Sequence, residues 1–311
     1  MKHLQLIILV LITLCTGLSA VSYQENQRSE YTIFYTAQDS RLDFSAISAQ
    51  LRVNIDQLQT GLGIYSSEPV EIFVIPDAAN YHLLSRGREN IVEFSDAFYS
   101  SLEKRIYIRN RGQINEDYGK VLMHEYIHWY LDNIFERSPL WFHEGMATYY
   151  AGQMGYDRYL EFIRARFWGK DTDLFRLGYS YPEDQSDWQQ YYLSAYFALQ
   201  LMKDKKAENW QHFWTLTASN WRKGKSTDFI PTFGQAYQTT LWDFANDYSR
   251  YSRRLAWQYL IIGINSLLLA LLPIILLWGW FKRRRLRAAL PDLPIPVDEE
   301  LPPDPEQPED I

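Results

Sequence analysis

The stretch VLMHEYIHWYLDN, Val121–Asn133, decides how the rest of the chain is interpreted. It holds two of the six histidines, which stand four residues apart with a glutamate directly after the first. On a helix, His124 and His128 project from the same face, so their imidazoles can share one tetrahedral zinc ion. Glu125 then lies about 100° round the helix, where a carboxylate can take a proton from a water that the ion polarises. The pattern His-Glu-x-x-His therefore predicts a zinc hydrolase.

The residues around this motif predict the helix that the geometry needs. Capping and first-turn residues lie at 115–117, and apolar residues follow at helical spacing: Val121, Leu122, Ile127, Leu131 and Ile134. The helix should end by Ser138, because Pro139 disfavours a helical residue before it. A second helix, with the sequence LWFHEGMATYY, is expected from Pro139 onward.

The third protein ligand is expected on this second helix. His143 and Glu144 are the candidates, and because adjacent helical residues point about 100° apart, only one of them should face the ion. Gly145 would let the second helix approach closely. A longer motif with a third histidine in the first helix is absent, since Leu131 and Ile134 stand where it needs Gly and His.

HEYIH followed by WFHEGMATYY resembles the gluzincin metallopeptidases, specifically the peptidase MA-like group, over residues 119–152. The resemblance implies that His124, His128 and Glu144 bind one zinc ion per chain and that Glu125 is the general base. It also implies an α+β, thermolysin-like catalytic domain with a strand-rich N-terminal subdomain, the two-helix metal site and a helical C-terminal subdomain. RIYIRN, at 105–110, is then the candidate for the edge strand that aligns the substrate backbone.

The chain also departs from this family. GREN, at 87–90, is a poor match to the box that holds the substrate amine in aminopeptidases, so aminopeptidase activity is not supported. Thr148 stands where many relatives have an acidic residue that orients a histidine, so that contact must come from another residue. The donor for the transition-state oxyanion remains open among Tyr191, Tyr192, Tyr196 and His212.

In the rest of the exported part, the pattern of apolar and polar residues predicts mainly strands in the first half and helices in the second. Strands are expected at 30–36, 69–77 and 105–110, and a helix at 44–63 that ends at Gly61-Leu62-Gly63. Further helices are expected at 156–167, 188–203 and around 241–257. The exported domain is expected to cover residues 21–255.

The two ends predict a membrane location. Residues 1–20 have the layout of a secretory signal, with an uncleaved anchor as the alternative. Residues 256–281 are long and apolar enough to span a bilayer. The basic cluster that follows, Lys282–Arg287, marks the cytoplasmic side, so the bulk of the chain should lie in the periplasm or outside the cell. Residues 282–311 form this basic segment and an acidic, proline-rich tail that should be disordered.

Composition excludes several other functions. The net charge of −7 gives no support for nucleic-acid binding. The single cysteine, Cys15, rules out an intramolecular disulfide and a thiolate zinc site. The sequence therefore predicts a single-pass membrane zinc metallopeptidase acting on proteins or peptides, with endopeptidase activity preferred. The alternatives are a catalytically inactive binding or assembly protein and, less favoured, an intramembrane protease; the oligomeric state stays open.

Overall fold

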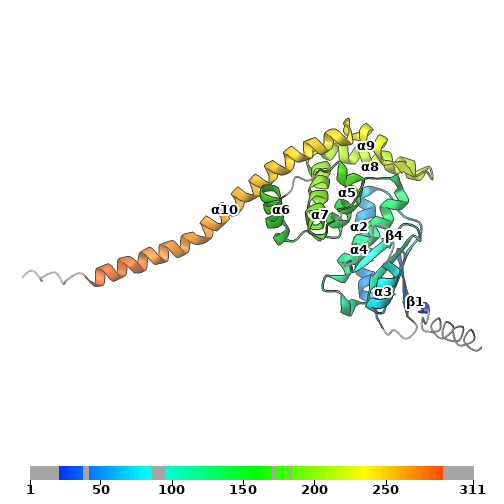
Figure 1. Ribbon diagram of the computed structural model, residues 1–311, viewed down its shortest axis with the longest axis horizontal. Coiled ribbons are helices and arrows are strands. Elements are labelled where there is room, and N and C mark those ends of the chain that lie inside the picture. Colours follow the sequence, from blue (N-terminus) through cyan, green and yellow to red (C-terminus); the bar gives the residue numbers. More distant parts are fainter. Residues whose placement is uncertain (1–20, 38–41, 86–94, 170–172, 183, 290–311) are drawn as a thin grey trace, which may run out of the picture. The chain divides into compact units, whose positions relative to one another are not determined.

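The computed structural model describes residues 21–37, 42–85, 95–169, 173–182 and 184–289. Three expectations lie outside these residues: the secretory signal at 1–20, the GREN segment at 87–90 and the acidic tail at 290–311. Figure 1 shows a blue-to-cyan half rich in strands followed by a green-to-yellow helical half. The expected order of strands first and helices second is therefore confirmed.

A five-stranded sheet forms the first half, in the order β1-β2-β3-β5-β4. The strands are β1 (Tyr23–Arg28), β2 (Thr32–Ala37), β3 (Val70–Ile75), β4 (Ala97–Ser100) and β5 (Arg105–Arg109). The three central strands, β2, β3 and β5, run parallel, and β1 and β4 pair antiparallel at the two edges. The three strands expected from sequence are β2, β3 and β5.

The prediction that RIYIRN forms the edge strand is wrong. β5 is hydrogen-bonded to β3 on one side and to β4 on the other, so the edge strand is β4. The physical reason is visible in the burial of β5, where Ile106, Tyr107 and Ile108 are all buried. Consecutive buried residues are typical of an interior strand covered on both faces. β4 is only four residues long, too short to show a pattern of its own.

Helices cover both faces of the sheet. On one face, Tyr81 of α3 (Ala78–Ser85) packs in a cluster with Ile75, Phe98 and Tyr107. Every second side chain along a strand points to the other face of the sheet. There, Phe34 of β2 stacks on Phe44, the residue directly before α2 (Ser45–Leu62). α2 ends as expected at Gly63, whose φ of 70° is the left-handed conformation that favours glycine.

The helix with the histidine motif, α4 (Tyr118–Ile134), contacts α2, β4 and β5. Its N-terminus is capped by Asp117, whose side chain accepts a hydrogen bond from the Lys120 backbone N–H at 3.1 Å. Its C-terminal half is tied to the edge strand, because the Tyr99 hydroxyl of β4 donates to Asp132 Oδ2 at 2.7 Å. α4 is therefore fixed against the open edge of the sheet.

The helical half packs around an aromatic core that includes Phe135, Phe142, Phe213, Trp214 and Phe229. Its helices are α5 (Leu140–Tyr150), α6 (Tyr156–Trp168), α7 (Gln185–Gln200), a π-helical turn (Leu201–Lys205), α8 (Ala207–Arg222), α9 (Phe229–Tyr237) and α10 (Leu241–Ala288). Short 3₁₀ turns lie at Arg111–Gln113 and Arg176–Gly178. Two short strands, β6 (Phe135–Arg137) and β7 (Thr227–Asp228), pair in parallel within this half.

The chain divides into two compact units, Met1–Trp257 and Gln258–Ile311. In the part of the chain that the structure describes, one helix, α10, is long and apolar enough to cross a membrane. In the second unit, Lys282 and Arg284 lie over the rings of Trp278 and Trp280 at 5.6 and 5.5 Å. The aromatic and basic residues at the end of the apolar stretch thus form one mixed band.

Candidate metal centre

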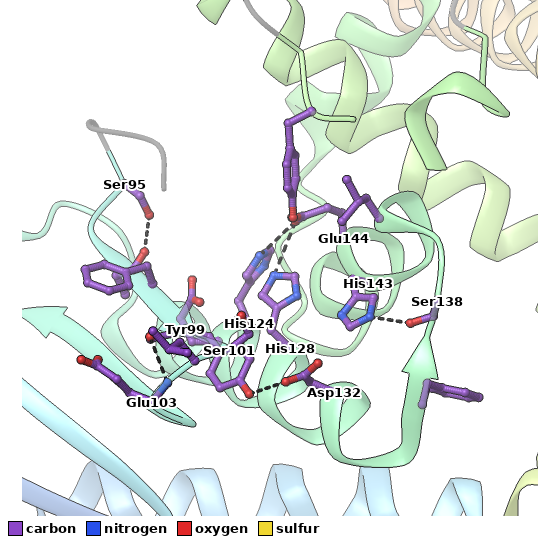
Figure 2. Close-up of a pocket in the computed structure, with 18 of the residues that line it drawn as sticks. Ser95, Tyr99, Ser101, Glu103, His124, His128, Asp132, Ser138, His143 and Glu144 are labelled. Atoms are coloured by element: carbon purple, nitrogen blue, oxygen red, sulfur yellow. Dashed lines mark hydrogen bonds and ion pairs between the residues drawn. The ribbon is translucent and has the colours of Figure 1, made fainter. Parts of the chain in front are cut away.

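Side chains from α4 and α5 converge on one point. His124 Nε2 lies 3.3 Å and His128 Nε2 lies 3.7 Å from Glu144 Oε2. One ligand atom from each of these three residues lies within 4.8 Å of the other two. Figure 2 shows the two imidazoles from successive turns of α4 pointing at the Glu144 carboxylate.

His143, the rival third ligand, has other partners. Its Nε2 lies 2.6 Å from the Ser138 hydroxyl, and its ring stacks on that of His128 with centroids 5.8 Å apart. Figure 2 shows this ring turned toward Ser138. The structure therefore places Glu144, and not His143, at the point where the two Nε2 atoms converge.

The Glu144 carboxylate tests whether this group of residues fits a metal ion. Its Oε1 accepts a hydrogen bond from the Tyr181 hydroxyl at 3.2 Å. Its Oε2 is buried and accepts no hydrogen bond, although both Nε2 atoms lie close to it. A buried carboxylate oxygen without a hydrogen bond is costly unless a cation compensates it. Two imidazole nitrogens and one carboxylate oxygen are a donor set that zinc takes in catalytic sites, with a fourth position left open.

A neutral side chain orients His124. Gln153 Oε1 lies 2.7 Å from His124 Nδ1, and because an amide oxygen only accepts, Nδ1 carries the proton. This contact turns the other ring nitrogen, Nε2, toward Glu144. Gly152 makes this contact possible: its φ of 65° ends α5 and turns the chain, so that Gln153 N–H reaches the Thr148 carbonyl at 3.2 Å. Gln153 thus supplies the histidine-orienting contact that was expected to come from a residue other than Thr148.

Burial and mutual charge shift the pKa values of these groups. Burial raises the pKa of Glu125 to about 7, and the charge of Glu144 adds to the rise while His124 opposes it. Burial also lowers the pKa of His128 to about 3. At His124, burial acts in the same direction, but the nearby Glu144 carboxylate outweighs it and raises the pKa to about 9. Burial disfavours the Glu144 carboxylate, yet His128 and His124 hold its pKa below the ordinary value. A proton on His124 thus balances the Glu144 charge, and metal binding would release it.

Two cavities meet at this centre. One, of about 710 Å³, is lined by the edge strand β4, by α4, by the start of α5 and by Tyr181 and Trp188. The other, of about 440 Å³, lies toward the N-terminal end of α4 and reaches Gln153 and Arg158. The residues that line both cavities are Ser95, His124, Glu125 and Tyr192. The centre therefore has free space on two sides.

The four residues considered as oxyanion donors lie in different places. Tyr192 lines both cavities, and its ring centroid is 6.4 Å from that of His124. Tyr191 is buried beside Tyr181, Tyr196 stacks on Tyr149, and His212 is exposed on α8. Of the four, the structure brings Tyr192 to the cleft.

Sequence reasoning did not identify Tyr181. This residue precedes α7, and its ring stacks on that of Trp188 with centroids 5.2 Å apart, which directs the hydroxyl at Glu144. The segment around it, YSYPEDQSD, has no periodicity, and the chain holds 23 tyrosines. The sequence therefore contained no signal that distinguished it from the others.

No protein-family model and no curated protein matches the chain. Solved structures show a partial likeness. One is an M1 zinc metallopeptidase mutant bound to L-arginine, with 15% identity, a TM-score of 0.40, and 75% of this chain and 51% of that chain covered. Another is an M1 zinc metallopeptidase mutant from Deinococcus radiodurans bound to a Tyr-Ser-Ala substrate, with 14% identity, a TM-score of 0.41, and 75% of this chain and 52% of that chain covered. An aminopeptidase N family protein from Idiomarina loihiensis has 12% identity and a TM-score of 0.42, with 74% of this chain and 46% of that chain covered. The chain thus spans about half the length of these proteins.

Proposed function

We propose that this chain is a membrane-anchored zinc peptidase whose ligands are His124, His128 and Glu144. The observation that carries the proposal is the convergence of two Nε2 atoms on a buried carboxylate oxygen that accepts no hydrogen bond. A zinc ion held by these three residues would act as a Lewis acid and lower the pKa of a water molecule in the cleft.

Glu125 is the general base in this proposal. It lies on α4 directly after His124, is 8% exposed and lines both cavities. A carboxylate buried in this way, with a pKa near 7, can take a proton from the attacking water and return it to the leaving amine. Tyr192 is the proposed donor to the developing oxyanion, because its side chain reaches the same cleft from α7.

An internal peptide bond is the proposed substrate. The edge strand β4 lines the larger cavity and can offer backbone hydrogen bonds to an extended chain. Space on both sides of Glu125 leaves room for substrate residues before and after the bond. These two features support an endopeptidase over an exopeptidase.

We further propose that α10 anchors the enzyme and that the catalytic unit lies outside the cytoplasm. The apolar part of α10 supports the anchor. The basic run Lys282–Arg287 after it and the signal-like segment at 1–20 support the orientation. Residues 21–255 would then form the catalytic domain and 256–281 the membrane span.

The test combines metal content with one substitution. The purified full chain should hold about one zinc ion and cleave an unfolded protein. Glu125→Gln should keep the zinc and lose about 10²–10⁴-fold in rate, whereas Glu68→Gln, an exposed control, should change neither. A chain that holds no zinc and cleaves nothing would overturn the proposal and favour a binding protein. An active Glu125→Gln variant would overturn the role of Glu125 as general base.

A second assay addresses the substrate class. A quenched fluorescent peptide with an acetylated N-terminus and an amidated C-terminus should be cleaved at an internal bond. Cleavage only of peptides with a free terminus would refute the endopeptidase assignment and leave the zinc assignment intact.

A further inference from the structure

Helix α6 presents two different faces. On its inner face, the ring of Phe162 packs against that of Phe197 of α7 with centroids 3.9 Å apart. On its outer face, Tyr156, Leu160 and Trp168 are 80%, 59% and 78% exposed. Their spacing of four or eight residues places them in one row along the helix. We call these three side chains the α6 ridge. Large apolar side chains gathered on one exposed face mark a surface that meets a partner or a membrane.

The end of α6 contacts α10 in the turns that precede the apolar stretch of that helix. Arg166 Nη2 donates to Ser252 Oγ at 2.6 Å and to the Ser249 carbonyl at 3.5 Å. One residue on, the Phe167 ring meets Trp257 edge to face at 4.8 Å. The chain continues from Trp257 directly into the apolar stretch of α10. α6 is thus held close to Trp257, the residue after which the apolar stretch of α10 begins.

The charges near this point suit a lipid headgroup layer. Arg164 lies in the same row as the α6 ridge and is exposed, and Arg253 and Arg254, one turn before Trp257, are exposed as well. Tryptophan and tyrosine concentrate at the membrane–water interface, and arginine can pair with lipid phosphates there. Helices with an apolar face and cations beside it lie in the plane of that interface, buried by about 5–10 Å.

We propose that the α6 ridge docks on the interfacial layer of the membrane that α10 enters, with Arg164, Arg253 and Arg254 at the lipid phosphates. This proposal rests on the proposed anchoring by α10 and not on the peptidase chemistry. In this proposal, lipid covers the α6 ridge. The test distinguishes lipid from the alternatives, which are a second copy of the chain or another protein.

The test uses spin labels on the full chain reconstituted in nanodiscs containing phosphatidylglycerol. In a Cys15→Ser background, Leu160→Cys carries the label on the ridge. Leu83→Cys, a similarly exposed leucine on α3, is the matched control, and Leu269→Cys lies inside the apolar stretch of α10. The accessibilities of each label to oxygen, which partitions into lipid, and to a water-soluble nickel chelate are compared.

The label at position 160 should favour oxygen over nickel several-fold more than the label at position 83 does. A water-exposed label at 160 together with a lipid-exposed label at 269 would overturn the docking and leave the anchor standing. A water-exposed label at 269 would overturn both. Low accessibility of position 160 to both reagents would show contact with protein and overturn the lipid assignment. Zinc content and peptide cleavage report on the peptidase proposal separately.

Discussion

Gly145, next to the proposed ligand Glu144, occupies a close contact between α5 and α7. A Cβ added there would lie 2.5 Å from the Ala195 carbonyl oxygen and 3.1 Å from Leu199 Cβ. The first contact is with backbone, so it can be relieved only by moving a helix. Gly61, in the last turn of α2, offers a matched control because a Cβ there would meet nothing within 4 Å. Glycine is thus required at 145 and merely tolerated at 61.

The same substitution should therefore have different effects on stability at the two sites. Alanine raises the stability of a helix by up to about 1 kcal/mol relative to glycine, and this term applies to both. Overpacking at position 145 costs about 1–3 kcal/mol. Gly61→Ala should then be up to about 1 kcal/mol more stable than the wild type, and Gly145→Ala neutral to about 3 kcal/mol less stable.

The assay is urea unfolding of the full chain in detergent, followed by near-ultraviolet circular dichroism. A chelator is present throughout, because bound metal would add its own free energy to the folded state. The critical quantity is the difference in unfolding free energy between Gly145→Ala and Gly61→Ala, because the helix-propensity contribution largely cancels in it. Equal unfolding free energies, or a more stable Gly145→Ala variant, would refute the claim that α5 and α7 meet at this glycine.

Three further predictions concern the centre and the helix that bears it. Gln153→Ala should weaken zinc affinity about 10–100-fold, because His124 Nδ1 loses its acceptor; unchanged affinity against a competing chelator would contradict this role. Asp117→Ala should lower the free energy of unfolding by about 0.5–2 kcal/mol, because the α4 cap is lost. Asp117→Asn should keep most of the stabilisation by the cap, so equal losses in the two variants would contradict the capping role. Tyr192→Phe should lower kcat by about 10²–10³-fold with zinc content unchanged, and Tyr191→Phe, which removes a buried hydroxyl outside the cleft, should leave kcat near the wild-type value.

Local pattern was sufficient to predict the elements that carry the site. Helical periodicity over four residues fixes the relation of His124 to His128 without any tertiary information. Pro139 separates α4 from α5, and the structure has this boundary: α4 ends at Ile134 and α5 begins at Leu140. The central strands could be predicted because they are rich in β-branched and aromatic residues, at 30–36 in alternation with polar ones.

Features that depend on distant parts of the chain could not be predicted in the same way. The edge position of β4 is set by pairing with β5, and four residues give too short a pattern to reveal it. Gln153 reaches His124 only because Gly152 turns the chain at the end of α5. Gly145 was expected to allow a close approach, but sequence alone could not show that its neighbour is Ala195 of α7.

If the proposed metal centre is correct, the small β6–β7 pairing has a consequence for when it can form. β6 lies between the helix that bears His128 and the helix that bears Glu144, and it pairs with a strand far downstream. Ser226 Oγ donates to Glu136 Oε1 at 2.7 Å across a separation of 90 residues. Contacts so distant along the chain form late, because a long loop must close first. A nascent chain that has all three proposed ligands but ends before residue 227 should therefore bind zinc weakly, and the proposed hydrolytic activity would start only after the helical half has been synthesised and folded.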